Sequence, residues 1–341
     1  MTRTAMLTTS SHSPIIEFPQ KETDSYRAVV ANLGAIRAEV EAYDPELVVI
    51  FGVDHYGGHH MNSMAPFCVG VEATALADVG GTPGPLNVPR AVAVDAVNHL
   101  RADGLDVAVS YAMDVDHGFT QALVKLTGGI DRYPVLPIFV SCIQPPFVPF
   151  ARMRLLGEAV GRFLRKVDAE RILVIGTGGL GHNPRALFPP IDEVEEKWRP
   201  YHLFGRAQTE VPQQEWIDFE IEAHHVAAAF LADESIPDEV FGLHDDWDKA
   251  FMSLFCAGDM TEFDGWNPDV VVDEAGIGAM EVLSWIAAGA AMAELTGKSP
   301  QHRFQQVCRV IGIGFGIASA GPSPIVWIEA GSGSDPALHI E

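Results

Sequence analysis

Short apolar runs alternate with amphipathic segments along the first half of the chain. An apolar run bounded by turn-forming residues indicates a buried strand, whereas apolar positions recurring every three or four residues indicate a helix. This pattern predicts helices at 23–43, 89–100 and 152–166, and strands at 5–9, 46–51, 106–111, 135–140 and 171–175. The alternation predicts an α/β fold with a mixed central sheet covered by helices.

One of these predicted strands, 135–140, contains prolines. Pro134 precedes it and Pro137 lies inside it. Because proline has no backbone N–H to donate to a neighbouring strand, the pattern predicts an edge position or a bulge.

The pattern changes after about residue 181. Prolines break up a polar stretch, and helices then dominate, with late strands predicted at 309–313 and 325–328 and helices at 213–231, 246–256 and 273–295. The proline-rich stretch allows a domain linker. The late strands favour a single domain, 1–341, with a helical insertion at about 190–300.

Composition narrows the classes of partner. The formal net charge is −24, from 22 basic and 46 acidic residues. Nucleic acids and anionic membranes bind basic surfaces, so we expect neither as a partner. An anionic substrate would need positive charge or a metal ion at its site.

The cysteines and the apolar segments bear on location. Cys68, Cys142, Cys256 and Cys308 are far apart and form no CxxC pair, which disfavours a disulfide framework or a thiolate zinc site. The first twenty residues lack the pattern of a signal peptide. The most apolar stretch, 282–295, is shorter than the roughly 20 residues that span a bilayer. We therefore expect a cytoplasmic protein.

Four histidines share a structural context. His12, His55, His117 and His182 each follow a predicted strand, among small or turn-forming residues. In an open α/β sheet the ligand crevice lies outside the carboxyl ends of the strands. We therefore expect these imidazoles to converge at one edge of the sheet.

A glycine-rich motif offers a nucleotide-binding alternative. Gly176–Gly181 matches GxGxxG and follows a strand, but this fingerprint requires a helix to begin there and hold the pyrophosphate. Pro184, Pro189 and Pro190 follow at once and exclude such a helix. These glycines are better explained by a sharp turn of the backbone beside a ligand.

Two other spacings resemble metal motifs. His55 and His59 are four residues apart, but Gly57 and Gly58 between them disfavour a helix. Residues 222–225 have the Glu-x-x-His spacing of a di-iron bundle, which requires two such motifs. We expect loop residues in the first case and the polar face of a helix in the second.

One carboxylate falls in an apolar segment. Glu281 lies within the predicted helix 273–295. An acid there must face solvent, pair with another group or bind a metal, because an unpaired buried charge is costly.

Several segments together carry a family resemblance. They cover residues 1–185 closely, and the second half loosely at 281–287 and 312–316, and they include Ser11–Pro14, Asp54–Gly57, Val115–Phe119, Pro134–Pro137 and Gly178–Leu180. In order and spacing the chain resembles the class III extradiol catechol dioxygenases of the protocatechuate 4,5-dioxygenase β-subunit type.

The resemblance implies a metal site. Its motifs place a mononuclear iron(II) on His12, His55 and Glu281, with Glu274 as the alternative carboxylate. Two imidazoles and one carboxylate form the facial triad of non-haem iron(II) oxygenases, which leaves positions open for substrate and dioxygen.

The resemblance also implies the groups that transfer protons. His117 and His182 would act as acid–base residues, with Asp116 as a group that could orient its neighbour. Gly181 departs from the serine that precedes the second histidine in relatives, which predicts a looser loop or a reshaped pocket.

The implied reaction is extradiol ring cleavage of a 3-substituted catechol, such as 2,3-dihydroxyphenylpropionate, by dioxygen in a homo-oligomer. Three alternatives stay open. They are an extradiol dioxygenase for a different catechol, a zinc-dependent hydrolase that uses the same histidines, and a binding protein without turnover.

Overall fold

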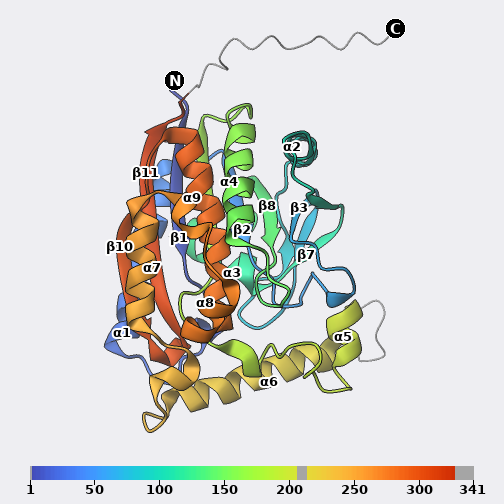
Figure 1. Ribbon diagram of the computed structural model, residues 1–341, viewed down its shortest axis with the longest axis vertical. Helices are drawn as coiled ribbons and strands as arrows, with labels where there is room; N and C mark the ends of the chain where they lie inside the picture. The colour runs from blue at the N-terminus through green and yellow to red at the C-terminus, as the bar shows by residue number, and fades with distance from the viewer. Residues whose placement is uncertain (1, 206–212, 327–341) are drawn as a thin grey trace.

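The computed structural model describes residues 2–205 and 213–326, in which helices cover both faces of an eight-stranded sheet (Figure 1). The strand order is β10 (Gln301–Cys308), β11 (Ile313–Pro324), β1 (Thr4–Ser10), β9 (Arg171–Thr177), β2 (Leu47–Gly52), β8 (Val135–Val140), β3 (Phe67–Gly70) and β6 (Ala108–Ser110).

The centre of this sheet is parallel. Strand β9 pairs in parallel with β1 and β2, and β2 pairs in parallel with β8. Strand β11 is antiparallel to β1 and to β10, and β3 is antiparallel to β8. The predicted mixed sheet is therefore confirmed. The central strands are continuous apolar runs because helices bury both of their faces.

Two helical layers bury the sheet. On one face lie α2 (Arg90–Ala102), α4 (Phe150–Leu164), α7 (Asp245–Ala257) and α9 (Val282–Thr296). On the other face lie α1 (Asp24–Tyr43) and α3 (His117–Thr127). The helices near the carboxyl ends of the parallel strands are α5 (Arg199–Phe204), α6 (Gln213–Ala232) and α8 (Pro268–Ala275), and α6 runs across these ends (Figure 1).

A second, smaller sheet lies beside the first and was not predicted. It has the order β5 (Gly84–Pro85), β4 (Ala73–Ala75), β7 (Met113–Val115). The strand predicted at 106–111 is shorter, and His117 follows β7 rather than that strand. Very short strands carry too few alternating positions to be recognised in a sequence.

The predicted edge position of residues 135–140 is wrong, because β8 lies between β2 and β3. Within β8, only Ile138, Phe139 and Val140 pair with β3. Pro137 lies just beyond these paired residues. The pairing with β3 therefore does not need the backbone N–H that proline lacks.

The single helix predicted at 273–295 is also wrong. Gly276 ends α8 with a φ of 82°, a 3-10 turn follows at Ile277–Glu281, and α9 begins only at Val282. An apolar pattern does not reveal this break, because residues 277–292 are buried on every side.

The late strands differ from the prediction as well. Arg309–Ile311 is a 3-10 turn that joins β10 to β11. Of the strand predicted at 325–328, residues 325 and 326 follow β11 without regular structure, and the other two lie outside the described residues.

One apolar segment has the length and composition of a membrane span. Ile277–Thr296 is long and apolar enough to cross a bilayer, but most of it is buried inside the fold. It contacts α4, β9 and β1. In this structure it therefore serves as a core helix.

A buried carboxylate on α7 touches the loop after β9. Asp248 is 0% exposed, and its Oδ1 accepts a hydrogen bond of 2.7 Å from the Gly181 N–H. Burial raises the pKa of Asp248 to about 7, although the hydrogen bond from Gly181 opposes this shift.

The close packing of α4 on α9 makes Gly157 sensitive to substitution. A Cβ at Gly157 would overlap the backbone carbonyl of Ala287, whereas a Cβ at Gly34 on α1 would meet nothing. We expect Gly157→Ala to lower the free energy of unfolding by about 1–3 kcal/mol, as overpacking does. Gly34→Ala is the matched control and should raise it by about 0.5–1 kcal/mol. Urea unfolding of both variants checks this, and equal effects would contradict the packing.

The raised pKa of Asp248 predicts a pH-dependent stability. The folded protein holds this proton up to about pH 7, whereas an unfolded Asp releases it near pH 3.9. The stability that the protonated Asp248 side chain contributes is therefore fully present below about pH 4 and is lost as pH rises towards 7. Asp248→Asn should gain stability relative to the parent as pH rises from 5 to 8. Asp246→Asn, on the exposed face of α7, is the control. Urea unfolding that shows the same difference for Asp248→Asn at both pH values would refute this.

Candidate active site

The histidines predicted to converge do meet at one edge of the sheet. His12, His55 and His182 follow the parallel strands β1, β2 and β9, and His117 begins α3. All four are buried. The ring centroid of His55 lies 5.4 Å from that of His12 and 4.2 Å from that of His117.

The carboxylate of Glu281 lies among these rings. Its Oε2 is 3.8 Å from His12 Nε2, and its Oε1 is 3.5 Å from His55 Nε2 and 3.7 Å from His182 Nε2. Glu281 is 1% exposed, and its Oε2 accepts a 2.6 Å hydrogen bond from the Gly179 N–H. Its Oε1 has no hydrogen-bond partner. An ionised carboxylate buried in this way is stable only with positive charge or hydrogen-bond donors beside it, because burial of an unpaired charge is costly in free energy.

Contacts at the far side of two rings orient them, a hydrogen bond for His12 and an ion-pair contact for His55. His12 Nδ1 lies 3.0 Å from Thr177 Oγ1, and His55 Nδ1 lies 3.4 Å from Asp116 Oδ2. The Nε2 atom of each ring is thereby directed at Glu281. Metal-binding histidines are commonly oriented in this way through their other nitrogen.

The electrostatics favours a cation between these groups. Burial lowers the pKa of His12 to about 3, so this ring is neutral. Burial also acts to lower the pKa of His55, but Asp116 and Glu281 outweigh it and raise that pKa. Burial would raise the pKa of Glu281, yet His12, His55 and His182 lower it to about 2. Metal ions bind ionised carboxylates and neutral imidazoles. A metal ion can therefore bind between these groups and take the place of the proton that they would otherwise share.

The partner of His117 was missed by the sequence analysis. Asp78 Oδ2 lies 2.5 Å from His117 Nδ1 and accepts a 2.9 Å hydrogen bond from the His117 backbone N–H. Asp78 lies in the loop after β4, and β4 was not predicted from the sequence. The sequence around Asp78 therefore showed only an acidic residue near glycines, which does not indicate a functional residue.

Asp116 does not orient its neighbour His117. Its Oδ1 accepts a 2.8 Å hydrogen bond from Gly118 N and caps α3, and its Oδ2 faces the backbone and ring of His55. The helix cap fixes this direction, because Asp is a preferred N-cap residue.

The position of His182 depends on neighbouring glycines. Its Nδ1 donates a 3.0 Å hydrogen bond to the Leu180 carbonyl, which directs Nε2 towards Glu281. A Cβ at Gly179 or at Gly278 would overlap the His182 ring. These glycines allow the backbone to approach a side chain, as their motif suggested.

The looser loop expected at Gly181 is not what the structure has. The Gly181 N–H donates to Asp248, and its carbonyl accepts a 2.9 Å hydrogen bond from Gly314 N. Both backbone groups of the residue before His182 are therefore held by other elements.

The alternative carboxylate lies elsewhere. Glu274, near the end of α8, is exposed and does not line the cavity. Within the described residues, His12, His55 and His117 each offer a nitrogen, and these nitrogens lie within 4.8 Å of one another. A second group, Asp78, Asp116 and His117, meets the same criterion. The edge of the sheet is thus a metal-capable site.

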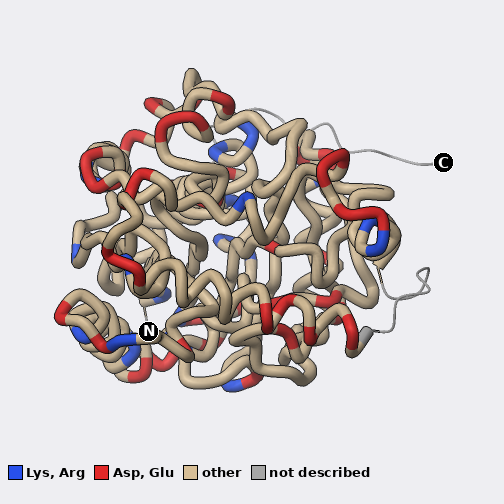
Figure 2. The backbone as a smooth tube through the Cα atoms, turned by 90° about the horizontal axis from the view of Figure 1, so that it is seen from below, with Lys and Arg blue, Asp and Glu red and all other residues tan. Residues whose placement is uncertain are grey.

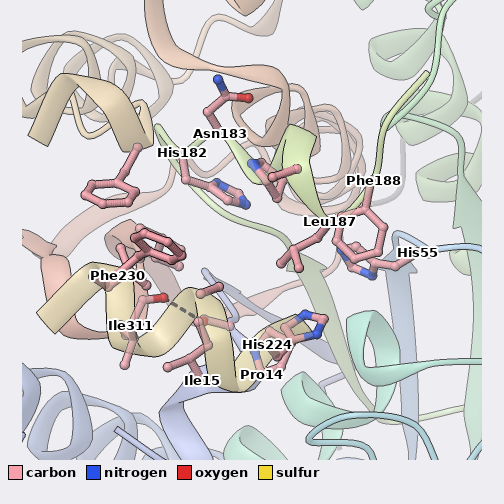
Figure 3. Close-up of a pocket in the computed structure, with 18 of the residues that line it drawn as sticks. Pro14, Ile15, His55, His182, Asn183, Leu187, Phe188, His224, Phe230 and Ile311 are labelled. Atoms are coloured by element: carbon pink, nitrogen blue, oxygen red, sulfur yellow. Dashed lines mark hydrogen bonds between the residues drawn. The ribbon is translucent and has the colours of Figure 1, made fainter. Parts of the chain in front are cut away.

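A cavity of about 420 Å³ lies directly over these groups. Figure 3 shows His55 and His182 on different elements with their rings turned into it. All four histidines and Glu281 line it, and its other walls include Ile15, Leu187, Phe188, His224, Phe230 and Ile311. Pockets of about 300–1,000 Å³ with few polar groups are typical of small-molecule sites.

One cavity residue corrects the interpretation of 222–225. Glu222 and His225 are exposed on α6, as expected for a polar helix face. His224 between them is 3% exposed and lines the cavity instead. The sequence could not reveal this, because α6 reaches the cavity only by crossing the strand ends.

Comparison with known proteins agrees with this geometry. Residues 6–315 match the family described as "Catalytic LigB subunit of aromatic ring-opening dioxygenase". The chain is 37% identical over 310 residues to a 2,3-dihydroxyphenylpropionate/2,3-dihydroxicinnamic acid 1,2-dioxygenase of Azotobacter vinelandii, covering 91% of this chain and 96% of the relative. It is 38% identical to the enzyme of that name from Mycobacterium ulcerans, covering 92% and 97%.

A third relative of the same name, from Paraburkholderia xenovorans, is 40% identical over 290 residues and covers 83% of this chain and 86% of the relative. The family match includes all four histidines and Glu281. The resemblance read from the sequence motifs is confirmed. The chain belongs to the family of the catalytic LigB subunit of aromatic ring-opening dioxygenases, and it is an extradiol catechol dioxygenase.

Proposed function

We propose that this enzyme uses iron(II) and dioxygen to open the ring of a 3-substituted catechol. The observation that carries the proposal is the convergence of two imidazole Nε2 atoms on the buried Glu281 carboxylate, at the floor of an apolar cavity. The substrate class rests on the names of the relatives, which specify 2,3-dihydroxyphenylpropionate.

The donor set fits iron(II). His12 and His55 each present a buried nitrogen, and Glu281 has one buried oxygen without a hydrogen bond. Two imidazoles and one carboxylate are the ligands of the facial triad. We assign the metal to these three residues rather than to His12, His55 and His117, because three neutral imidazoles would leave Glu281 outside the set. Bound iron(II) would supply a centre at which catechol and dioxygen can react together.

His117 is assigned the role of base for a catechol hydroxyl. Its Nδ1 is committed to Asp78, so Nε2 is the nitrogen left to accept a proton. The Asp78 carboxylate would stabilise the imidazolium that forms. His117 could return this proton later as an acid.

His182 is assigned the role of the second acid–base or hydrogen-bonding group. Its Nε2 lines the cavity on the side opposite His55 (Figure 3). Asp116 is assigned a positioning role, since it holds the backbone and ring of His55.

Several features of the whole protein belong to the same proposal. We assign residues 1–341 to one domain with a helical insertion at about 190–300, and we place the enzyme in the cytoplasm without a nucleic-acid or membrane partner. A homo-oligomer is supported by exposed apolar side chains on α6 outside the cavity, namely Phe219 and Ile221. Light scattering of the purified protein tests the oligomer.

The proposed reaction is tested under controlled oxygen. Protein purified without oxygen is loaded with iron(II), mixed with catechol, 3-methylcatechol or 2,3-dihydroxyphenylpropionate, and then exposed to oxygen. We expect one dioxygen consumed per ring and a coloured ring-opened product. Absence of uptake with every catechol, together with zinc-dependent hydrolysis of an ester or amide, would establish the hydrolase instead.

The ligand assignment predicts different losses in different variants. His12→Ala, His55→Ala and Glu281→Gln should bind iron(II) at least about tenfold more weakly, because the alanines remove a nitrogen donor and the glutamine removes the carboxylate charge. His117→Ala should keep its iron and lose about 10²- to 10⁴-fold in kcat. Metal analysis after anaerobic dialysis checks this. Normal iron in Glu281→Gln with loss in His117→Ala would favour the three-histidine set.

The Asp78–His117 pair predicts a further effect. Asp78→Asn removes the charge that stabilises a protonated His117, so we expect kcat to fall about 10- to 100-fold with iron content unchanged. The double variant Asp78→Asn/His117→Ala should be no slower than His117→Ala alone, because the pair acts as a unit. Steady-state rates across pH check this, and additive losses would place Asp78 outside the proton path.

A further inference from the structure

We propose that the cavity selects catechols whose 3-substituent is uncharged and apolar, such as an alkyl or aryl chain, over those that carry a carboxylate. This inference rests on the proposed ring cleavage and names the substrate class for the same site. Its basis is the contrast between the polar floor of the cavity and the walls above it.

Polar groups are concentrated at the floor, where the catechol oxygens would lie. The walls beyond are contributed by separate elements: the turn after β1 provides Ile15, α6 provides Phe230, and the turn before β11 provides Ile311. Phe230 is 56% exposed and Val240 is 61% exposed, although both line the cavity. The apolar lining therefore continues to the surface, along the path that a ring substituent would take.

No lysine or arginine lines this cavity in the part of the chain that the structure describes. Arg309 adjoins the wall, with its guanidinium 5.1 Å above the Phe241 ring. It donates to the carbonyls of Leu231 and Asp233 and pairs with Asp238. Its charge is paired and each of its three nitrogens already donates a hydrogen bond, so it is a poor partner for a substrate carboxylate.

The histidine that lines the cavity on α6, His224, is neutral. His224 Nδ1 donates a 2.7 Å hydrogen bond to the Glu220 carbonyl, so the other nitrogen of the neutral ring is an acceptor. Burial lowers the pKa of His224 to about 3. The free nitrogen of this ring would present a lone pair to a substrate carboxylate, and two hydrogen-bond acceptors do not attract each other. The polar side chains left on the walls, Ser13 and Asn183, carry no charge.

The wider field also disfavours an anion. Seen from the end where α6 lies, acidic residues outnumber basic ones along the chain (Figure 2), and the net charge of the whole sequence is −24. A carboxylate would give up its hydration on entry and gain no cation in return, whereas each buried methylene of an alkyl chain is favourable.

A matched pair of substrates tests this selection. We expect kcat/KM of the iron(II) enzyme to be at least about tenfold higher for 3-butylcatechol than for 2,3-dihydroxyphenylpropionate, because only the second is charged. Calorimetry on the metal-free protein should show the same order of affinity, which separates binding in the cavity from turnover.

Variants at the cavity mouth sharpen the test. Phe230→Arg places a cation on the wall at an exposed position, and it should shift the kcat/KM ratio about tenfold or more towards the carboxylated substrate. Val226→Arg is the matched control, since Val226 is 45% exposed on the same helix but does not line the cavity. It should leave the ratio unchanged.

The outcomes separate the two proposals. If no catechol is opened, including unsubstituted catechol and 3-methylcatechol, the proposed function fails. If rings are opened but 2,3-dihydroxyphenylpropionate is the equal or better substrate, only the apolar selection fails. Arg206 is the one lysine or arginine in the sequence that lies outside the described residues. A preference for the carboxylate that disappears in Arg206→Ala would also overturn the inference and would identify the missing cation.

Discussion

The buried carboxylate of Glu281 is the constraint around which the site is organised. A buried acid must be matched by donors or by positive charge, and here the Gly179 N–H and three imidazole rings surround it. These partners come from segments more than 90 residues away in the sequence. The loop after β9 can approach Glu281 only because its glycines leave room. Replacing the carboxylate would therefore disturb the packing of the loop as well as the charge of the site.

The fold places this acid by interrupting an apolar segment. Gly276 ends α8, and the short 3-10 turn that follows sets Glu281 at the start of α9. The rest of α9 is packed against the sheet and α4, so the turn cannot shift without disturbing the core. The ionised Glu281 side chain thus lies at the residue that precedes the apolar helix α9. The other walls of the cavity come from α6 and from turns near the ends of the strands.

The pKa values of His12 and His55 are shifted in opposite directions, although the two rings lie close together. His12 meets mainly burial, which lowers its pKa, whereas His55 faces both Asp116 and Glu281, which raise its pKa. A metal ion would satisfy both environments, since it ligates neutral rings and balances the carboxylates. The Asp78 carboxylate and the His117 imidazole lie beside this group, and we propose that this pair carries protons separately from the metal ligands.

Local patterns in the sequence were enough for the central strands and for His12, His55 and His182. Each apolar run is continuous, and in a parallel sheet the residues after such runs meet at one edge. The same pattern included His117, although that residue follows β7 rather than the predicted strand. The family motifs then assigned roles to His117 and Glu281. What only the tertiary structure decided involves segments with no local relation. Examples are Asp78 beside His117, Asp116 turned to His55, β8 inside the sheet, and His224 on the cavity wall. The physical reason is that strand order, a break in a fully buried helix and the placing of α6 depend on packing between distant residues, which periodicity along the chain does not record.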